Sequence, residues 1–224
     1  MIRTIVFALV VAIATVAVPA HAQMSKLKGL IGGKSPASES SSAAIPDEAA
    51  QEALVQRFIT SQAHSLQAQS SFAKAFGLAE QVQLLEAERQ ALSSGSVELD
   101  QMKKSVSVSD SAQKAIDERM AAQPELSAEA KQHYIEGLVL LIKSADEGRK
   151  LSGEASTFAS GMKSMGAAQL ATLGRKLVAG AWVAKESPGY LKGLYSSSRS
   201  ALTFARAAKI KVPGNADAML DALK

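Results

Sequence analysis

Gly33-Lys34-Ser35 is the first of three short patterns in this sequence whose residue types could carry out chemistry. The same tripeptide ends the phosphate-binding loop of nucleotide hydrolases, where the lysine and the hydroxyl meet the phosphates and their metal ion. That loop requires a glycine five positions before its last one, but Lys28 stands there. It also requires a strand before it and a helix after it, whereas a Ser-rich stretch follows here. We therefore predict that these residues bind no nucleotide.

The second pattern is a pair of metal-ligating residue types, His133 and Glu136, whose three-residue spacing places both on one face of a helix. A zinc or di-iron site needs more ligands than this pair supplies. His64 is the only other histidine after residue 22, and it has no second histidine at helical spacing. We expect an exposed polar pair and no metal site. The chain has no cysteine, which excludes thiolate ligands and thiol nucleophiles.

The third pattern is Ser-x-x-Lys, the nucleophile motif of penicillin-recognising enzymes. It occurs at Ser71/Lys74, Ser111/Lys114 and Ser160/Lys163. Serine and lysine are common enough here that chance alone gives roughly two such pairs, and the companion Lys-Thr-Gly is absent. A triad assembled from distant residues stays open. The sequence therefore leaves enzymatic activity undecided, favours a protein without it, and indicates no cofactor.

Charge is distributed unevenly along the chain. Residues 23–158 carry 14 basic and 18 acidic residues, whereas residues 159–224 carry 10 basic and 3 acidic ones. A basic surface of this kind can bind an acidic protein or anionic lipid headgroups. The alternative is that the basic third packs against the acidic remainder of the same chain. The candidate contact surface consists of Lys163, Arg175, Lys176, Lys185, Lys192, Arg199, Arg206, Lys209 and Lys211.

Small residues are frequent between residues 155 and 184. Small side chains on one helix face allow close approach of a second helix, which usually means tight packing inside a bundle. The same face could instead form a contact between copies of the chain or a groove for a lipid chain. Trp182 and Tyr190 would then be candidates to line such a groove, although both residue types are more often part of a core.

The first 22 residues have the three parts of a secretory signal: Arg3, an apolar run over residues 5–18, and Ala20-His21-Ala22. We expect cleavage after Ala22 and a periplasmic or secreted protein without disulfides. Residues 23–46 are predicted to form a flexible Ser/Gly-rich linker. The next most apolar stretch, residues 165–184, contains Arg175 and Lys176. Because each charge costs about 2.5–3.5 kcal/mol inside a bilayer, we expect no transmembrane helix after the signal.

Residues 47–224 are predicted to form one all-α domain, a helical bundle of about six helices. Hydrophobic residues make up 47% of the chain and aromatic residues only 4%, and apolar positions recur at helical spacing. Asp47 and Ser127 are predicted to cap the first helix and a long later one, and Gly77 to end the first. Further helices are expected over residues 78–93, 96–123, 167–185 and 216–223, and from Ser187-Pro188 onward.

Two features suggest interruptions in these helices. Residues 105–109 read Ser-Val-Ser-Val-Ser, which alternates like a strand, so we expect a break there with Ser109 or Asp110 capping a new helix. The long helix after Ser127 contains three glycines, each of which weakens a helix by about 1 kcal/mol relative to alanine. We expect it to bend or end near one of them. These glycines are Gly148, Gly153 and Gly161.

The signal, the helical pattern, the basic C-terminal third and the lack of a complete catalytic motif together favour an exported, non-enzymatic interaction or accessory protein of the bacterial cell envelope. Its expected partner is an envelope protein or an anionic lipid surface, and the basic C-terminal third is the expected contact region. The alternative is a carrier that holds an envelope lipid or small apolar ligand in a cavity between helices. Nucleic acid is not an expected partner of an exported protein, and the sequence leaves the oligomeric state open.

Overall fold

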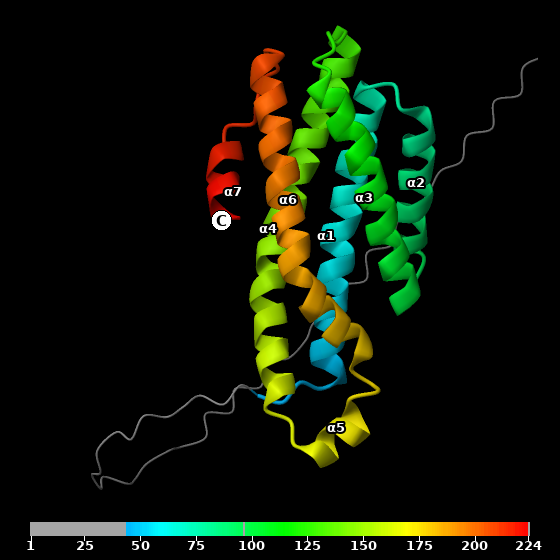
Figure 1. The fold of residues 1–224 in the computed structure, drawn as a ribbon, viewed down its shortest axis with the longest axis vertical. Helices are drawn as coiled ribbons and strands as arrows, with labels where there is room; N and C mark the ends of the chain where they lie inside the picture. The colour runs from blue at the N-terminus through cyan, green and yellow to red at the C-terminus, as the bar shows by residue number, and fades with distance from the viewer. Residues whose placement is uncertain (1–43, 96, 224) are drawn as a thin grey trace, which may run out of the picture. The chain divides into compact units, whose positions relative to one another are not determined.

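The computed structural model describes residues 44–95 and 97–223. The predicted signal over residues 1–22, the Gly33-Lys34-Ser35 stretch and the predicted linker up to residue 43 lie outside this part of the chain. The described residues form an all-α bundle, as the sequence predicts (Figure 1). Over those same ranges, no helix combines the length and the apolar character that spanning a bilayer requires.

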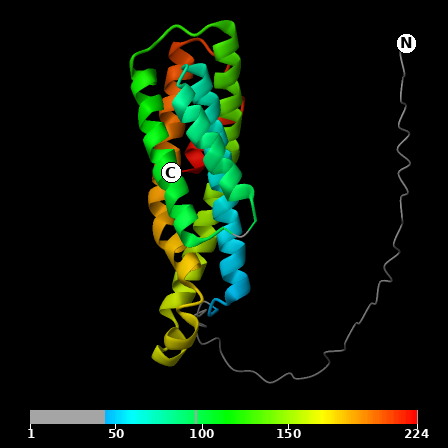
Figure 2. The same ribbon diagram turned by 90° about the vertical axis from the view of Figure 1, so that its right-hand side faces the viewer.

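Five long helices and two short ones make up the described bundle. The long ones are α1 (Glu48–Ala75), α2 (Ala79–Ser93), α3 (Leu99–Ala121), α4 (Ala128–Lys163) and α6 (Val178–Ala207). The short ones are α5 (Ala167–Leu173) and α7 (Ala216–Ala222). The antiparallel pair α1 and α4 has the most extensive packing, α6 packs along α4, and the α2–α3 hairpin covers α1. Figures 1 and 2 show that α3 and α6 run in the same direction as α1.

The helix boundaries at Asp47, Ser127 and Gly77 confirm the sequence-based expectation. The carboxylate of Asp47 accepts a hydrogen bond from the backbone N–H of Ala50 at 2.8 Å. The hydroxyl of Ser127 accepts one from the N–H of Ala130 at 3.1 Å. Gly77 has φ +68°, a left-handed conformation that ends α1 and that glycine adopts without steric cost.

The expected break over residues 105–109 is wrong, because α3 is continuous through it. Ser105 and Ser109 stand four positions apart, face α1 and are buried. The side-chain amide of Gln62 donates to the backbone carbonyl of Ser105 at 3.1 Å, and that of Gln69 donates to the carbonyl of Ser109 at 3.1 Å. The valines between these serines are half-buried. The alternating pattern is therefore a helix whose polar face meets two glutamines of α1.

α4 is one helix from Ala128 to Lys163, so Gly148 and Gly153 do not break it, and the expected end near one of the glycines is found near Gly161. A Cβ atom at Gly148 would lie 2.7 Å from Leu194 Cδ1 of α6. At Gly161 it would meet the backbone oxygen of Ala44. The packing that these glycines allow outweighs their low helix propensity, while α4 ends two residues after Gly161.

The expected helix start at Ser187-Pro188 is wrong as well, because both residues lie inside α6. The hydroxyl of Ser187 does not cap a helix and instead donates back to the carbonyl of Val183 at 2.7 Å. Pro188 is exposed. The expected helix over residues 167–185 is divided into α5 and the start of α6, because the chain turns to bury Leu177 completely.

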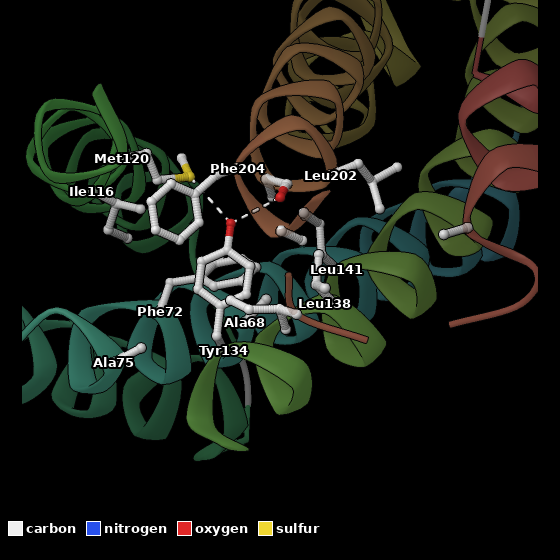
Figure 3. Packing of buried hydrophobic residues seen from close by; sticks show 14 of the residues in the cluster. Ala68, Phe72, Ala75, Ile116, Met120, Tyr134, Leu138, Leu141, Leu202 and Phe204 are labelled. Carbon is white, nitrogen blue, oxygen red and sulfur yellow. Dashed lines mark hydrogen bonds between the residues drawn. The ribbon is translucent and has the colours of Figure 1, made fainter. Parts of the chain in front are cut away.

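Two groups of buried side chains hold the bundle together. In the first, Tyr134 of α4 is fully buried among aromatic rings (Figure 3). Its hydroxyl donates to the carbonyl of Ala201 at 2.9 Å, and its ring centroid lies 4.8 Å from that of Phe72 and 5.2 Å from that of Phe204. The second group surrounds Phe58 of α1 and joins α1, α2, α3, α4 and α6.

Candidate functional site

The residues of the candidate catalytic and metal-binding patterns do not come together in the fold. His133 Nδ1 lies 3.3 Å from Glu136 Oε2 on the surface of α4. Within the described ranges, no group of three or more histidine, cysteine, aspartate or glutamate side chains is arranged to hold a metal ion. In the first Ser-x-x-Lys pair, Lys74 makes an ion pair with Glu86 at 2.7 Å. These residues therefore form no common site.

All nine basic residues of the candidate contact surface are exposed, and the fold divides them into three groups. Lys163, Arg175 and Lys176 flank α5, Lys209 and Lys211 follow α6, and the other four lie along α6. Three of the nine have an acidic partner in the described part of the chain. These are Lys176 with Glu48 at 2.7 Å, Lys185 with Glu186 at 3.5 Å, and Arg206 with Asp217.

The cations on α6 form a row, because each stands seven residues after the last. Seven residues are almost two helical turns, so the row has a spacing of about 10 Å along one face. Lys192 and Arg199, in its middle, have no acidic partner among the residues that the structure describes. The row consists of Lys185, Lys192, Arg199 and Arg206.

A groove lies beside this row, between α3 and α6. Two successive hollows along it enclose about 310 and 590 Å³. Residue numbers on both walls rise together from one hollow to the next, which fits two helices that run in the same direction. The first hollow is bounded by Val106, Asp110 and Gln113 of α3 and by Glu186, Gly189, Gly193 and Ser197 of α6. The second is bounded by Asp117, Met120 and Ala121 of α3 and by Ser196, Arg199, Ser200, Thr203 and Ala207 of α6.

The groove is open where glycines and serines of α6 line it. A Cβ atom at Gly189 or Gly193 would meet no other atom within 4 Å. These small residues of α6 lie outside residues 155–184, the segment whose small side chains were expected to form a contact or a groove. In that segment Gly161 and Gly180 serve close packing instead, against Pro46 and Phe158. The signal for the groove was the run Ser196-Ser197-Ser198 with glycines one and two helical turns before it.

The floor of the first hollow is formed by Phe58, Ser65 and Gln69 of α1. Gln69 is buried, and its amide nitrogen donates to the carbonyl of Ser109 and to Gln113 Oε1, both at 3.1 Å. Gln69 Oε1 accepts a hydrogen bond from the Ser109 hydroxyl at 3.0 Å. Because these polar groups are hydrogen-bonded to one another, this part of the floor needs no further hydrogen-bond partner, whether or not a ligand covers it.

Charged side chains line both walls of the groove. Asp110 and Asp117 line the α3 wall, and partial burial raises the pKa of both carboxyl groups above the usual aspartate value. A hydrogen bond from Gln113 to Asp117 Oδ1 at 2.9 Å partly opposes that rise in the second. Arg199 lines the opposite wall in the second hollow, whereas the acidic Glu186 lines that wall in the first. The groove can therefore orient a ligand that carries both charges.

Tyr190, named from the sequence as a candidate for a lipid groove near residues 155–184, lines the first hollow of this different groove. Its hydroxyl lies 2.9 Å from the Ser61 hydroxyl and 3.5 Å from that of Ser144, and burial raises its pKa to about 12. The phenol therefore stays protonated and acts as a structural link among α1, α4 and α6. Trp182, the second predicted groove residue, packs edge-on against Phe58 with ring centroids 5.4 Å apart.

A separate, mostly apolar hollow of about 740 Å³ lies between the start of α1 and the end of α4. It includes Ile45, Ala53, Leu54 and Phe158. No protein-family model matches this chain, and comparison with curated proteins and with solved structures gave no match. The geometry of the described residues is therefore the whole basis for a functional conclusion.

Proposed function

We propose that this chain is an exported helical accessory protein of the bacterial cell envelope, and that it binds another protein through the α3–α6 groove. The observation that carries the proposal is the combination of an open α6 wall with charged residues along both sides. Gly189 and Gly193 leave space that the chain does not fill, although tight packing is found wherever glycines of α4 face another helix.

The dimensions of the groove suit a helical partner. From Gly189 to Ala207 the α6 wall extends for about 27 Å at the helical rise, which is the length of a typical helix of four or five turns. An amphipathic helix that lies in a groove is a common mode of peptide recognition. Small residues on the groove wall allow helix axes to approach within about 8–10 Å.

Charge defines which helix fits. Acidic Asp110 and Asp117 on α3 favour a partner with basic residues on that side, whereas Arg199 on α6 favours an acidic residue on the other. Such complementarity contributes mainly to orientation and association rate. A uniformly anionic surface is disfavoured at this face, because the α3 wall would repel it. The proposed partner is therefore a protein helix with one acidic and one basic edge.

Site-specific crosslinking tests this function. The chain has no cysteine, so Gly193→Cys places a single photoactivatable crosslinker in the groove, and Ala87→Cys on exposed α2 is the matched control. We expect one envelope protein to crosslink from position 193 and not from position 87, and unlabelled protein to compete for it.

A blocking variant makes the test specific. Gly189→Trp fills the groove at an exposed position and should abolish crosslinking from position 193, while helix content stays the same. Asp110→Lys should weaken the crosslink through repulsion of the basic edge of the partner. Equal crosslinking from positions 87 and 193, or crosslinking that survives Gly189→Trp, would refute the groove as the contact site.

The alternative function, a carrier of a lipid or small apolar ligand, is favoured by one observation, the apolar hollow between α1 and α4. Its volume is within the range of small-molecule sites. Native mass spectrometry of the purified protein should then reveal a bound acyl chain that Ala53→Trp removes. Retention of the same ligand by that variant would place the ligand elsewhere.

A further inference from the structure

The short helix α5 differs from every other described element in its surroundings. It lies at one end of the bundle, and no other helix packs alongside it (Figures 1 and 2). Residues 167–172 are all exposed, including the large apolar side chain of Leu170 at 51%. The segment is anchored at its two sides, because Met165 and Leu173 pack against the Phe58 group. The helix α5 therefore presents apolar surface to its surroundings from between two packed side chains.

Exposed apolar side chains gather at this end. Five large hydrophobic residues are strongly exposed in the described part of the chain, and three of them belong to this end: Ile45, Leu170 and Val178. Ile45 precedes α1, whose first turn contacts the segment after α5, because Lys176 of that segment pairs with Glu48. The other two, Leu84 and Val139, lie singly on α2 and α4.

Cations flank this apolar surface on both sides in sequence. Lys163 precedes α5 and Arg175 follows it, both are exposed, and neither has an acidic partner among residues 44–95 and 97–223. Lys176 is also exposed, although it pairs with Glu48. Apolar side chains framed by lysine and arginine are typical of segments that lie at the interface of an anionic bilayer. A protein interface would instead be depleted of lysine and enriched in aromatic anchors, which residues 163–178 lack.

We propose that residues 163–178, here called the tip, dock on the surface of an anionic lipid bilayer. Leu170 and Val178 enter the boundary between headgroups and acyl chains, while Lys163 and Arg175 contact the lipid phosphates. Two apolar side chains and two or three cations give weak, reversible and salt-sensitive attachment. This inference is independent of the groove, because the tip and the groove share no residue.

An environment-sensitive fluorophore on a single cysteine tests the inference directly. Leu170→Cys places the probe at the tip, and Leu84→Cys is the matched control because Leu84 is 52% exposed on α2. With vesicles of phosphatidylglycerol and phosphatidylethanolamine, the probe at position 170 should shift to the blue and brighten, whereas the probe at 84 should not. Vesicles of phosphatidylcholine should give no response at either position, and high salt should reverse the response at 170.

Cosedimentation with the same vesicles measures affinity. Leu170→Asp should weaken binding by about tenfold or more, and Lys163→Gln with Arg175→Gln should reduce both binding and its salt dependence. Leu84→Asp should leave binding unchanged. Thermal midpoints should stay the same, since these side chains are exposed.

Several outcomes would overturn the proposal. One is a protein that binds no anionic vesicles, and another is a probe at position 170 that remains in water on vesicles that do bind. A third is equal loss of binding in the Leu170→Asp and Leu84→Asp variants. Loss of a protein partner without loss of vesicle binding in the tip variants would assign the tip to a protein contact instead. Crosslinking from Gly193→Cys remains a separate readout of the groove.

Discussion

Glycines on α4 and on α6 have opposite surroundings. A Cβ atom at Gly137 of α4 would lie 2.6 Å from the ring of Phe72, and the same atom at Gly148 would collide with Leu194. At Gly189 and Gly193 of α6 the corresponding space is empty. The first pair of glycines allows helices to pack closely, whereas the second pair keeps a groove open. Residue type alone therefore does not distinguish a core contact from a binding surface.

The largest expected effect comes from filling the α4 contact. Gly137→Ala should lower the free energy of unfolding by about 1–3 kcal/mol, because Phe72 is almost fully buried and has no space into which it can move. Urea unfolding measures the change. Gly153→Ala on the same helix is the control, since its Cβ meets no atom within 4 Å, and it should not destabilise. A Gly137→Ala variant as stable as the parent chain would mean that the α1–α4 contact is looser than described.

The same comparison of core and groove applies to two tyrosines, since Tyr134 lies in the core and Tyr190 lines the groove. Burial raises the pKa of Tyr134, and raises that of Tyr190 to about 12 from the ordinary value of 10.0. The unfolded chain therefore loses these phenol protons first, so their contribution to stability is complete below pH 10 and declines as pH rises above it. The expected slope is about 1.4 kcal/mol per pH unit for each tyrosine.

Comparison of variants isolates this contribution from other groups that titrate at alkaline pH. Tyr190→Phe should reduce the loss of stability between pH 10 and 12, while Ser61 and Ser144 keep their hydrogen bonds to each other's carbonyl groups. Urea unfolding at a series of pH values gives the slope. An identical slope in the parent chain and in Tyr190→Phe would show that the phenol is accessible to solvent through the groove.

Substitutions at the open α6 glycines should stabilise the protein, whereas Gly137→Ala should destabilise it. Gly193→Ala should raise the free energy of unfolding by about 0.5–1 kcal/mol, because alanine restricts the unfolded chain and meets no clash in the helix. The same change at Gly189 should add a similar amount. Thermal and urea unfolding of the double variant measure the sum, and destabilisation would contradict an open groove.

The smallest expected effect lies where α6 ends. Lys209 has φ +53°, a left-handed conformation in which a lysine side chain is strained. Lys209→Gly should therefore stabilise the protein, by about 1 kcal/mol at most. The thermal midpoint measures the gain, and a lower midpoint would show that the lysine stem covers apolar surface that glycine leaves exposed.

Local signals predicted the all-α fold and several of its boundaries. Asp47 and Ser127 act on amides three residues away, so their capping could be read from the sequence. The fate of Ser105 and Ser109 could not, because it depends on partners from another helix. Gln69 lies 40 residues before Ser109, and without it the alternating segment has no visible reason to be helical.

The candidate site was predictable only in part, for the same reason. The nine basic residues are exposed, yet their separation into a tip group, a row and an end group depends on where helices begin and end. The groove requires α3 and α6 to lie side by side, although about 80 residues separate its two walls in the sequence. The space at Gly193 is open because no side chain of another helix reaches it. No local pattern encodes such a space.

Because α6 is one unbroken helix, it sets the distance between the tip and the groove. Val178 is eleven residues before Gly189 and 29 before Ala207, so the helical rise places the two ends of the groove wall about 17 and 44 Å from the start of the helix. With α6 upright on a bilayer, a partner would be held within that range of heights. One residue inserted between Val178 and Gly189 would change the height by only about 1.5 Å, but would turn the groove by about 100° around the helix axis.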